Sequence, residues 1–182
     1  MVYQNHTGEW MNRNFNKNWR KSIIVLSGGF DPVHKGHLRM FREASWLGHH
    51  VIVGLNSDDW LTRKKGKPFM EFEERKEILE SIKYINQVIP FDDSDDTASD
   101  VIKRVYSLYS GREYEYDYLD IGHTGMTDYY QIYFANGGDR GKGNVPEVDV
   151  CKDLGVIMLW GVGGGKIQSS SDLTKKWETN ND

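Results

Sequence analysis

Two histidines three residues apart, His34 and His37, have the spacing and surroundings that suit chemistry on a phosphate group. They follow a turn made of Gly28, Gly29, Phe30 and Asp31, and Gly36 lies between them. Glycines let backbone N–H groups approach an anion closely, and the start of a helix adds the positive end of its dipole. Two imidazoles there can donate hydrogen bonds to a phosphorus centre as it gains negative charge. This stretch therefore predicts a phosphate site.

Two alternatives exist for the same histidines. With Asp31 they could hold a transition metal, but no further ligand has suitable spacing. They could also be surface or capping residues of no chemical use. Gly29, Asp31 and Gly36 follow the apolar run at the positions that a strand, a turn and a helix around a phosphate would need. This spacing favours the phosphate site over both alternatives.

The elements that would position this turn alternate along the chain from Ser22 onward. Strands are predicted at residues 22–27, 51–55, 88–90, 131–135 and 156–160. Helices are predicted up to Leu47, at 71–82 and 97–109, from 144 to Gly155, and from Ser169. This order predicts an α/β fold with a doubly wound five-stranded parallel sheet, whose ligands bind beyond the carboxyl ends of the strands.

Composition limits the class of protein. The chain has 182 residues and a net charge of −4, which argues against a general nucleic-acid binder. The single cysteine excludes an internal disulfide framework and suits a reducing cytosol. No apolar run approaches the roughly 20 residues that span a bilayer, and no signal peptide is evident. We expect a cytoplasmic protein with an N-terminal extension at 1–21, one domain at 22–178 and an insertion at about 110–130.

Further motifs follow the predicted strands. A basic loop at 63–68 holds Lys64, Lys65 and Lys67, which are placed to neutralise a triphosphate. The acidic run at 92–96 is interpreted as a solvated lead-in to a helix rather than a metal site.

Glycine-rich and hydroxyl-bearing segments occupy the later strand ends. Gly138, Asp139 and Arg140 follow the fourth strand, where a nucleobase or ribose could lie against backbone, although a plain turn would use the same residues. Lys166 ends a glycine-rich lead-in that could contact phosphate or close over a substrate. Ser169, Ser170 and Ser171 could cap the last helix and touch phosphate at once.

Together these motifs resemble the cytidylyltransferase-like nucleotidyltransferase superfamily, across about residues 22–175. Its shared element is His-x-Gly-His after Gly-x-Phe-Asp, and its fold is a Rossmann-like, HIGH-type nucleotidyltransferase sheet. The resemblance implies that His34 and His37 contact the nucleotide phosphates and stabilise the transition state, with Lys67 as the catalytic basic residue. It also implies phosphate contacts from Arg75 and the serine segment, a substrate contact from Asp58, and a turn held by Asp31.

The resemblance implies a nucleotidyltransferase that moves a nucleoside monophosphate from CTP or ATP to a phosphorylated small molecule and releases pyrophosphate. Mg²⁺ would accompany the triphosphate, and a homodimer is possible. The helix around Arg75 resembles glycerol-3-phosphate cytidylyltransferases and heptose-phosphate adenylyltransferases, whereas Asp-Pro-Val-His resembles nicotinate-mononucleotide adenylyltransferases. The choice between CTP and ATP therefore stays open, with a lean toward CTP. A catalytically silent nucleotide-binding protein is a further alternative, whereas a redox Rossmann domain would need a Gly-x-Gly-x-x-Gly motif that the first turn lacks.

Overall fold

The computed structural model describes residues 2–4, 10–12, 21–110, 130–137, 145–165 and 167–179. Its elements are β1 (Val2–Gln4), β2 (Trp10–Asn12), β3 (Ser22–Gly28), α1 (Lys35–Leu47), β4 (His50–Leu55), α2 (Asp58–Lys65), α3 (Phe72–Glu80), β5 (Gln87–Pro90), α4 (Ser99–Tyr109), β6 (Gln131–Gly137), α5 (Val148–Leu154), β7 (Ile157–Val162) and α6 (Ser170–Thr179).

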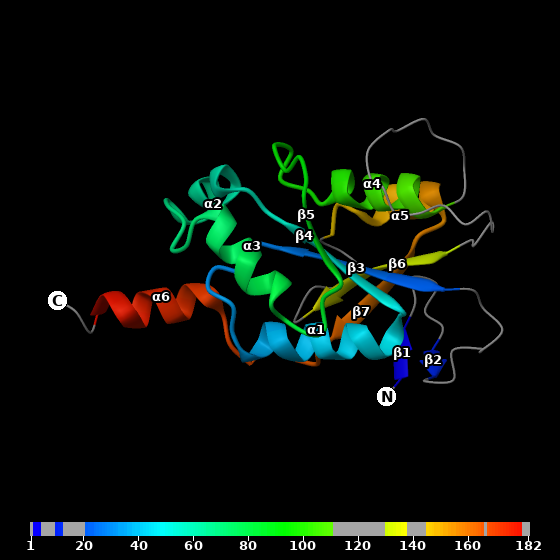
Figure 1. The fold of residues 1–182 in the computed structure, drawn as a ribbon, viewed down its shortest axis with the longest axis horizontal. Coiled ribbons are helices and arrows are strands. Elements are labelled where there is room, and N and C mark those ends of the chain that lie inside the picture. Colours follow the sequence, from blue (N-terminus) through cyan, green and yellow to red (C-terminus); the bar gives the residue numbers. More distant parts are fainter. Residues whose placement is uncertain are drawn as a thin grey trace.

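Five strands form one sheet in the order β5-β4-β3-β6-β7, and every pairing within it is parallel (Figure 1). The predicted fold class is therefore confirmed. The strand order reverses between β3 and β6, because the chain builds outward from β3 first to one side and then to the other. A reversal of this kind leaves a crevice at the carboxyl ends of the two central strands, where ligands bind in such sheets.

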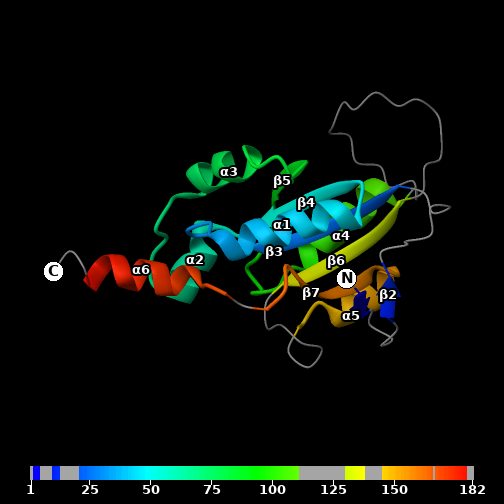
Figure 2. The same cartoon turned by 90° about the horizontal axis from the view of Figure 1, so that it is seen from below.

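Helices cover both faces of the sheet (Figures 1 and 2). On one face Phe41 and Leu47 of α1 and Leu79 of α3 are buried against alternate residues of the central strands. On the other face Val101 and Val105 of α4 are buried with α5. Because both faces are covered, the strands consist of continuous apolar runs without polar alternation.

The largest difference from the prediction concerns the basic loop at 63–68. Its first half, residues 63–65, belongs to helix α2. The Ser57 side chain accepts a hydrogen bond from the backbone N–H of Trp60 (3.0 Å) and so caps the helix start. Gly66, with φ of 90°, ends the helix and donates its N–H to the carbonyl of Thr62 (2.9 Å). These cap signals place Lys64 and Lys65 on a helix and leave Lys67 in the loop behind it.

Outside the central sheet, β1 and β2 pair antiparallel, and β1 contacts β7. They lie within the extension predicted at 1–21. Residues 111–129 of the predicted insertion lie outside the described residues, so the proposed domain limits stay a prediction.

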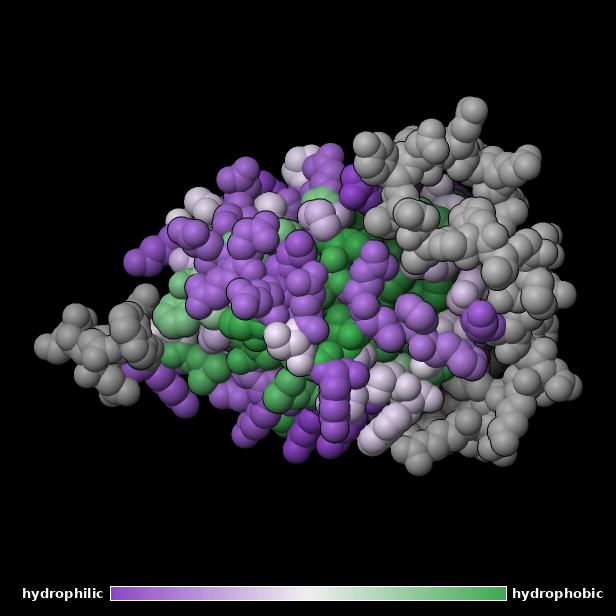
Figure 3. All heavy atoms as spheres, viewed as in Figure 1, coloured by the Kyte–Doolittle hydropathy of each residue, from purple (hydrophilic) through white to green (hydrophobic). Residues whose placement is uncertain are grey.

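The described surface is mixed in character. Figure 3 shows hydrophilic side chains over much of one face, with hydrophobic residues gathered between them. The large apolar side chains that stay exposed are Leu38, Trp46, Phe69, Ile78, Leu108 and Ile167. Among the described residues, no helix has the length and apolar content needed to cross a membrane.

Candidate active site

His34 and His37 cap helix α1 with their own side chains. The Nδ1 atom of His34 accepts hydrogen bonds from the backbone N–H groups of Gly36 (3.1 Å) and His37 (3.4 Å). The Nδ1 atom of His37 accepts from the backbone N–H of His34 (3.4 Å), which completes a capping box. Since Nδ1 of each ring is an acceptor, this hydrogen bonding assigns the proton of each neutral imidazole to Nε2. Each ring can therefore donate one hydrogen bond to a ligand.

The electrostatic surroundings keep both rings neutral. Burial lowers the pKa of His37 to about 3, and the positive charges of His34 and Lys65 act in the same direction. Burial also lowers the pKa of His34. The two rings stack with centroids 3.7 Å apart and planes 15° apart. At neutral pH the site thus presents two uncharged N–H donors side by side.

Asp31 fixes the loop between α2 and α3 against the histidine turn. Its side chain is buried, and its two oxygens accept the backbone N–H groups of Phe69 and Met70, each at 2.8 Å. The backbone carbonyl of Asp31 accepts a hydrogen bond from Lys65 Nζ (2.8 Å). The carboxylate is committed to backbone N–H groups, as is Nδ1 of each histidine, which disfavours the alternative of a transition-metal site. Asp31 therefore joins the histidine turn to the loop at 66–71, and it does not line the cavity described below.

A cavity of about 400 Å³ opens at the carboxyl ends of β3, β6 and β7. Its lining brings together predicted residues from separate parts of the chain: Gly28, Gly29, Phe30, His34, Gly36, His37, Lys65, Ser169, Ser170 and Ser171. The Ser170 hydroxyl donates to the carbonyl of Pro32 (2.9 Å), which ties the serine segment to the histidine turn. Gly138, Asp139, Arg140 and Lys166 lie outside the described residues.

The lysines are arranged differently from the prediction. Lys65 lines the cavity, whereas neither Lys64 nor Lys67 does. The ammonium of Lys64 lies over the Trp60 ring, 5.7 Å from its centroid, and Lys67 is exposed. A helix turns each residue by a fixed angle, so only one of the neighbouring lysines of α2 faces the site. Of the three lysines predicted in this segment, Lys65 is the one that the structure places in the cavity wall.

Arg75 requires a correction, because its side chain is completely buried. Its guanidinium donates to the carbonyls of Gly29 (2.7 Å), Asn56 (3.0 Å) and Met70 (3.1 Å). It also forms an ion pair with Asp58 at 2.6 Å. Arg75 therefore ties α3 to the ends of β3 and β4, and its complete burial keeps it away from a phosphate in the cavity. Asp58 is committed to the same contact and to the backbone N–H of Phe72 (3.0 Å), and neither residue lines the cavity.

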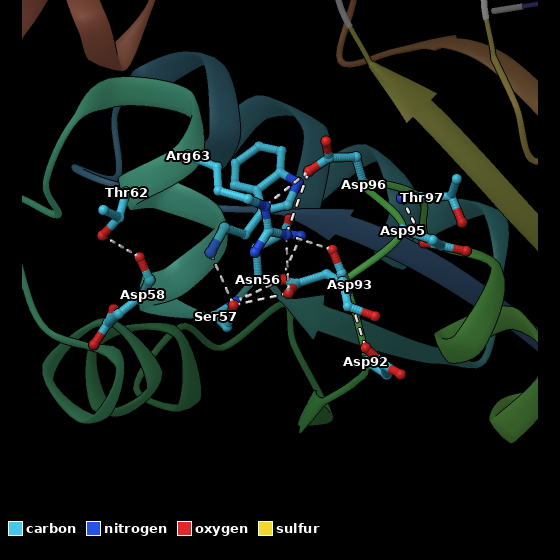
Figure 4. Close-up of polar contacts among 12 residues, drawn as sticks. Asn56, Ser57, Asp58, Thr62, Arg63, Asp92, Asp93, Asp95, Asp96 and Thr97 are labelled. Carbon is cyan, nitrogen blue, oxygen red and sulfur yellow. Dashed lines mark hydrogen bonds and ion pairs between the residues drawn. The ribbon is translucent and has the colours of Figure 1, made fainter.

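A buried carboxylate that the sequence pattern did not reveal organises the start of α2 (Figure 4). Asp93 is buried, although the acidic run around it was predicted to be solvated. Its oxygens accept from Asn56 Nδ2 (3.0 Å) and from the backbone N–H and hydroxyl of Ser57 (2.7 and 2.8 Å). Its backbone carbonyl accepts from Arg63 (2.7 Å). Asp93 thereby sets the direction of α2, and with it the position of Lys65.

A second carboxylate absent from the prediction, Glu43, joins α1 to the glycine loop after β7. It is buried, and its Oε2 accepts the backbone N–H of Gly163 (2.6 Å). Burial raises the pKa of this carboxyl group. Gly163 has a φ of 88°, and a Cβ there would lie 2.8 Å from Met40 Cα. Only a glycine allows this loop to press against α1, where it lines the cavity.

Neutral imidazole donors, an ammonium group and hydroxyl groups thus converge on one cavity at the switch point of a doubly wound parallel sheet. This combination of fold and site defines a nucleotidyltransferase. Residues 25–150 match the family model described as cytidylyltransferase-like, and the chain belongs to that family. The resemblance predicted from the histidine turn is confirmed.

Individual relatives agree with this assignment. The glycerol-3-phosphate cytidylyltransferase of Bacillus subtilis is 30% identical over 99 residues, which cover 53% of this chain and 77% of that protein. The ethanolamine-phosphate cytidylyltransferase of Mus musculus is 36% identical over 67 residues, or 37% of this chain and 17% of that protein. A solved bifunctional NMN adenylyltransferase/ADP ribose pyrophosphatase from Francisella tularensis shares the fold, with a TM-score of 0.57 at 16% identity. It aligns with 88% of this chain and 43% of its own.

Proposed function

We propose that this chain transfers a nucleoside monophosphate from CTP or ATP to a phosphorylated small molecule and releases pyrophosphate. The names of two relatives, a glycerol-3-phosphate and an ethanolamine-phosphate cytidylyltransferase, support a phosphorylated acceptor and favour CTP. The observation that carries the proposal is the pair of neutral imidazoles whose Nδ1 atoms are held by backbone N–H groups. Their Nε2–H groups are left to face a phosphate at the start of α1.

The reaction requires little covalent chemistry from the protein. An oxygen of the acceptor's phosphate attacks the α-phosphorus of the triphosphate, a new P–O bond forms, and the bond to the β-phosphate oxygen breaks. The attacking oxygen is already anionic, so no general base is needed. Catalysis then consists of positioning and of stabilising the negative charge on the α-phosphate oxygens.

The residues of the cavity divide this work. The Nε2–H groups of His34 and His37 donate to the α-phosphate oxygens as their charge grows. Lys65 neutralises part of the charge of the phosphates, and the hydroxyls of the serine segment contact the departing pyrophosphate. A neutral imidazole suits this role because it donates a hydrogen bond without transferring its proton.

Mg²⁺ is expected to enter with the triphosphate, whose charge it partly neutralises. Among the described residues, no group of three or more His, Cys, Asp or Glu side chains is arranged to hold a metal ion. The cavity supplies hydroxyl oxygens from the serine segment, which suit a hard cation already coordinated by phosphate oxygens and water. We therefore propose that the ion enters as part of the nucleotide substrate.

Pyrophosphate release tests the proposal directly. CTP and ATP are each incubated with glycerol 3-phosphate, heptose 1-phosphate, phosphocholine and nicotinate mononucleotide, and pyrophosphate is measured. His37→Gln keeps a side chain that can accept at the capping position but replaces the ring Nε2–H with an amide donor at a different position, so kcat should fall by about 100-fold. His37→Ala should lose at least as much.

His50 provides the matched control, because it is exposed and lies at the opposite, amino-terminal end of β4. His50→Gln should keep the wild-type rate. Full activity in both His37 variants would overturn the role given to the histidines. Absence of pyrophosphate release from the wild type with every pair, while CTP or ATP still binds, would instead indicate the catalytically silent alternative.

A further inference from the structure

Asn136 is a nearly enclosed polar residue at the carboxyl end of β6. The residue is 2% exposed and lines the cavity. The ladder between β6 and β7 is regular up to the pair Ala135–Leu159 and shifts before the pair Gly137–Val162. Asn136 therefore lies at a register shift between the two strands, one strand away from the turn that carries the histidines.

The carboxamide of Asn136 has an unpaired donor. Its Nδ2 is enclosed and has no hydrogen-bond partner among the described residues. Buried polar groups in native proteins are almost always paired, because an unpaired one has lost its water without compensation. An unpaired amide in the wall of a ligand cavity is explained if the ligand supplies the partner.

The position of Asn136 indicates which part of a nucleotide it would meet. With the α-phosphate at the histidine turn after β3, the nucleoside extends along the sheet edge toward β6, whose backbone is about 4.8 Å away. Ala135 and Gly137, which flank Asn136, also line the cavity. This placement depends on the proposed function, because it takes the phosphate site as given.

We propose that the carboxamide of Asn136 hydrogen-bonds the nucleobase of the triphosphate and contributes to its selection. An amide carries a donor and an acceptor side by side, and rotation about its last bond exchanges them. Cytosine and adenine each present a ring-nitrogen acceptor next to an amino donor, so an amide can engage either base with two hydrogen bonds. Asn136 thus suits both candidate nucleotides. It provides a polar group that can recognise the base at the nucleoside end of the cavity.

The test compares Asn136→Ala and Asn136→Leu with the wild type. Binding is measured for CTP, ATP, ribose 5-triphosphate and inorganic tripolyphosphate. Both variants should bind the preferred nucleotide about 10- to 100-fold more weakly than the wild type does. Their affinity for ribose 5-triphosphate and tripolyphosphate should stay within about twofold, because these probes lack the base. The Leu variant, which has a similar shape, should melt no lower than the wild type, since it removes an unpaired buried group.

Several results would overturn the inference. An unchanged affinity for CTP and ATP in both variants would remove Asn136 from base recognition while leaving the transferase assignment in place. An equal loss for all four probes, together with a lower melting temperature, would show a structural role instead. An equal loss for the nucleotides and for ribose 5-triphosphate would move the contact from the base to the ribose. If the wild type itself bound CTP and ATP no better than tripolyphosphate, the proposed function would fail together with this inference.

Discussion

The stability of the protein should depend on pH through His37 in a way that the variant His37→Gln removes. The folded chain holds the pKa of this residue near 3, mainly by burial and then by the charges of His34 and Lys65. In the unfolded chain the pKa returns to the ordinary histidine value of 6.5. The unfolded state therefore binds the proton first as pH falls, and the free energy of unfolding declines below about pH 6.5.

The size of the effect follows from the separation of these two values. Each pH unit between them costs up to about 1.4 kcal/mol of stability, so the decline from pH 7.5 to 5.0 is about 2 kcal/mol for this residue alone. Gln suits the third helical position of a capping box, so the variant keeps the helix start without the titrating group.

Urea unfolding of both proteins at pH 7.5, 6.5, 5.5 and 5.0 measures the difference between their unfolding free energies. Other titrating groups are common to both proteins and largely cancel. The wild type should lose about 2 kcal/mol relative to the variant between the two ends of this range. A difference that stays constant, or that grows in favour of the wild type at low pH, would refute the buried neutral state of His37.

Two further substitutions test the walls of the cavity. Lys65→Met should lower kcat/KM for the triphosphate by about 10-fold or more, whereas Lys67→Met should change it by less than about twofold, since Lys65 lines the cavity and Lys67 does not. The reverse ranking in a pyrophosphate assay would restore the sequence-based choice of Lys67. Gly163→Ala should destabilise the fold by about 1–3 kcal/mol and raise KM for the triphosphate, because its Cβ would lie 2.8 Å from Met40 Cα at a φ of 88°. In the control Gly165→Ala the added Cβ meets no atom within 4 Å, so equal effects of the two alanines in thermal melts would contradict the packing described.

The sequence was sufficient for the fold and for most of one wall of the site. Continuous apolar segments separated by helical patterns predicted the parallel sheet. Because the carboxyl ends of parallel strands meet at one edge of the sheet, the same pattern predicted which segments lie around the cavity. The histidine turn and the serine segment were found because each directly follows a strand or opens a helix. Local pattern and topology together determined where these residues lie.

The incorrect predictions concern which way a side chain points, not where its residue lies in the fold. Arg75 belongs to the same buried stripe as Leu79, four residues later on α3, so helical spacing did contain a signal that it faces inward. The resemblance to a phosphate-binding helix outweighed that signal. Asp93 gave no comparable sign, because a run of acidic residues does not reveal which one turns toward Asn56 and Ser57. The resemblance favours Lys67 over Lys65, and the loop predicted at 63–68 does not determine which lysine faces the cavity. In the structure, the caps at Ser57 and Gly66 define helix α2 instead, and the helix determines which lysine faces the cavity.

The mutual cap of His34 and His37 has a consequence for catalysis beyond the placement of two rings. The backbone N–H groups that fix Nδ1 belong to the first turn of α1, so the imidazoles are oriented as soon as that turn forms. Donors that are oriented before the substrate arrives need no reorganisation when charge develops, and such preorganisation accounts for a large share of enzymatic rate enhancement. Folding of one helical turn therefore aligns both imidazoles before any ligand binds. Fraying of that turn would withdraw both donors together.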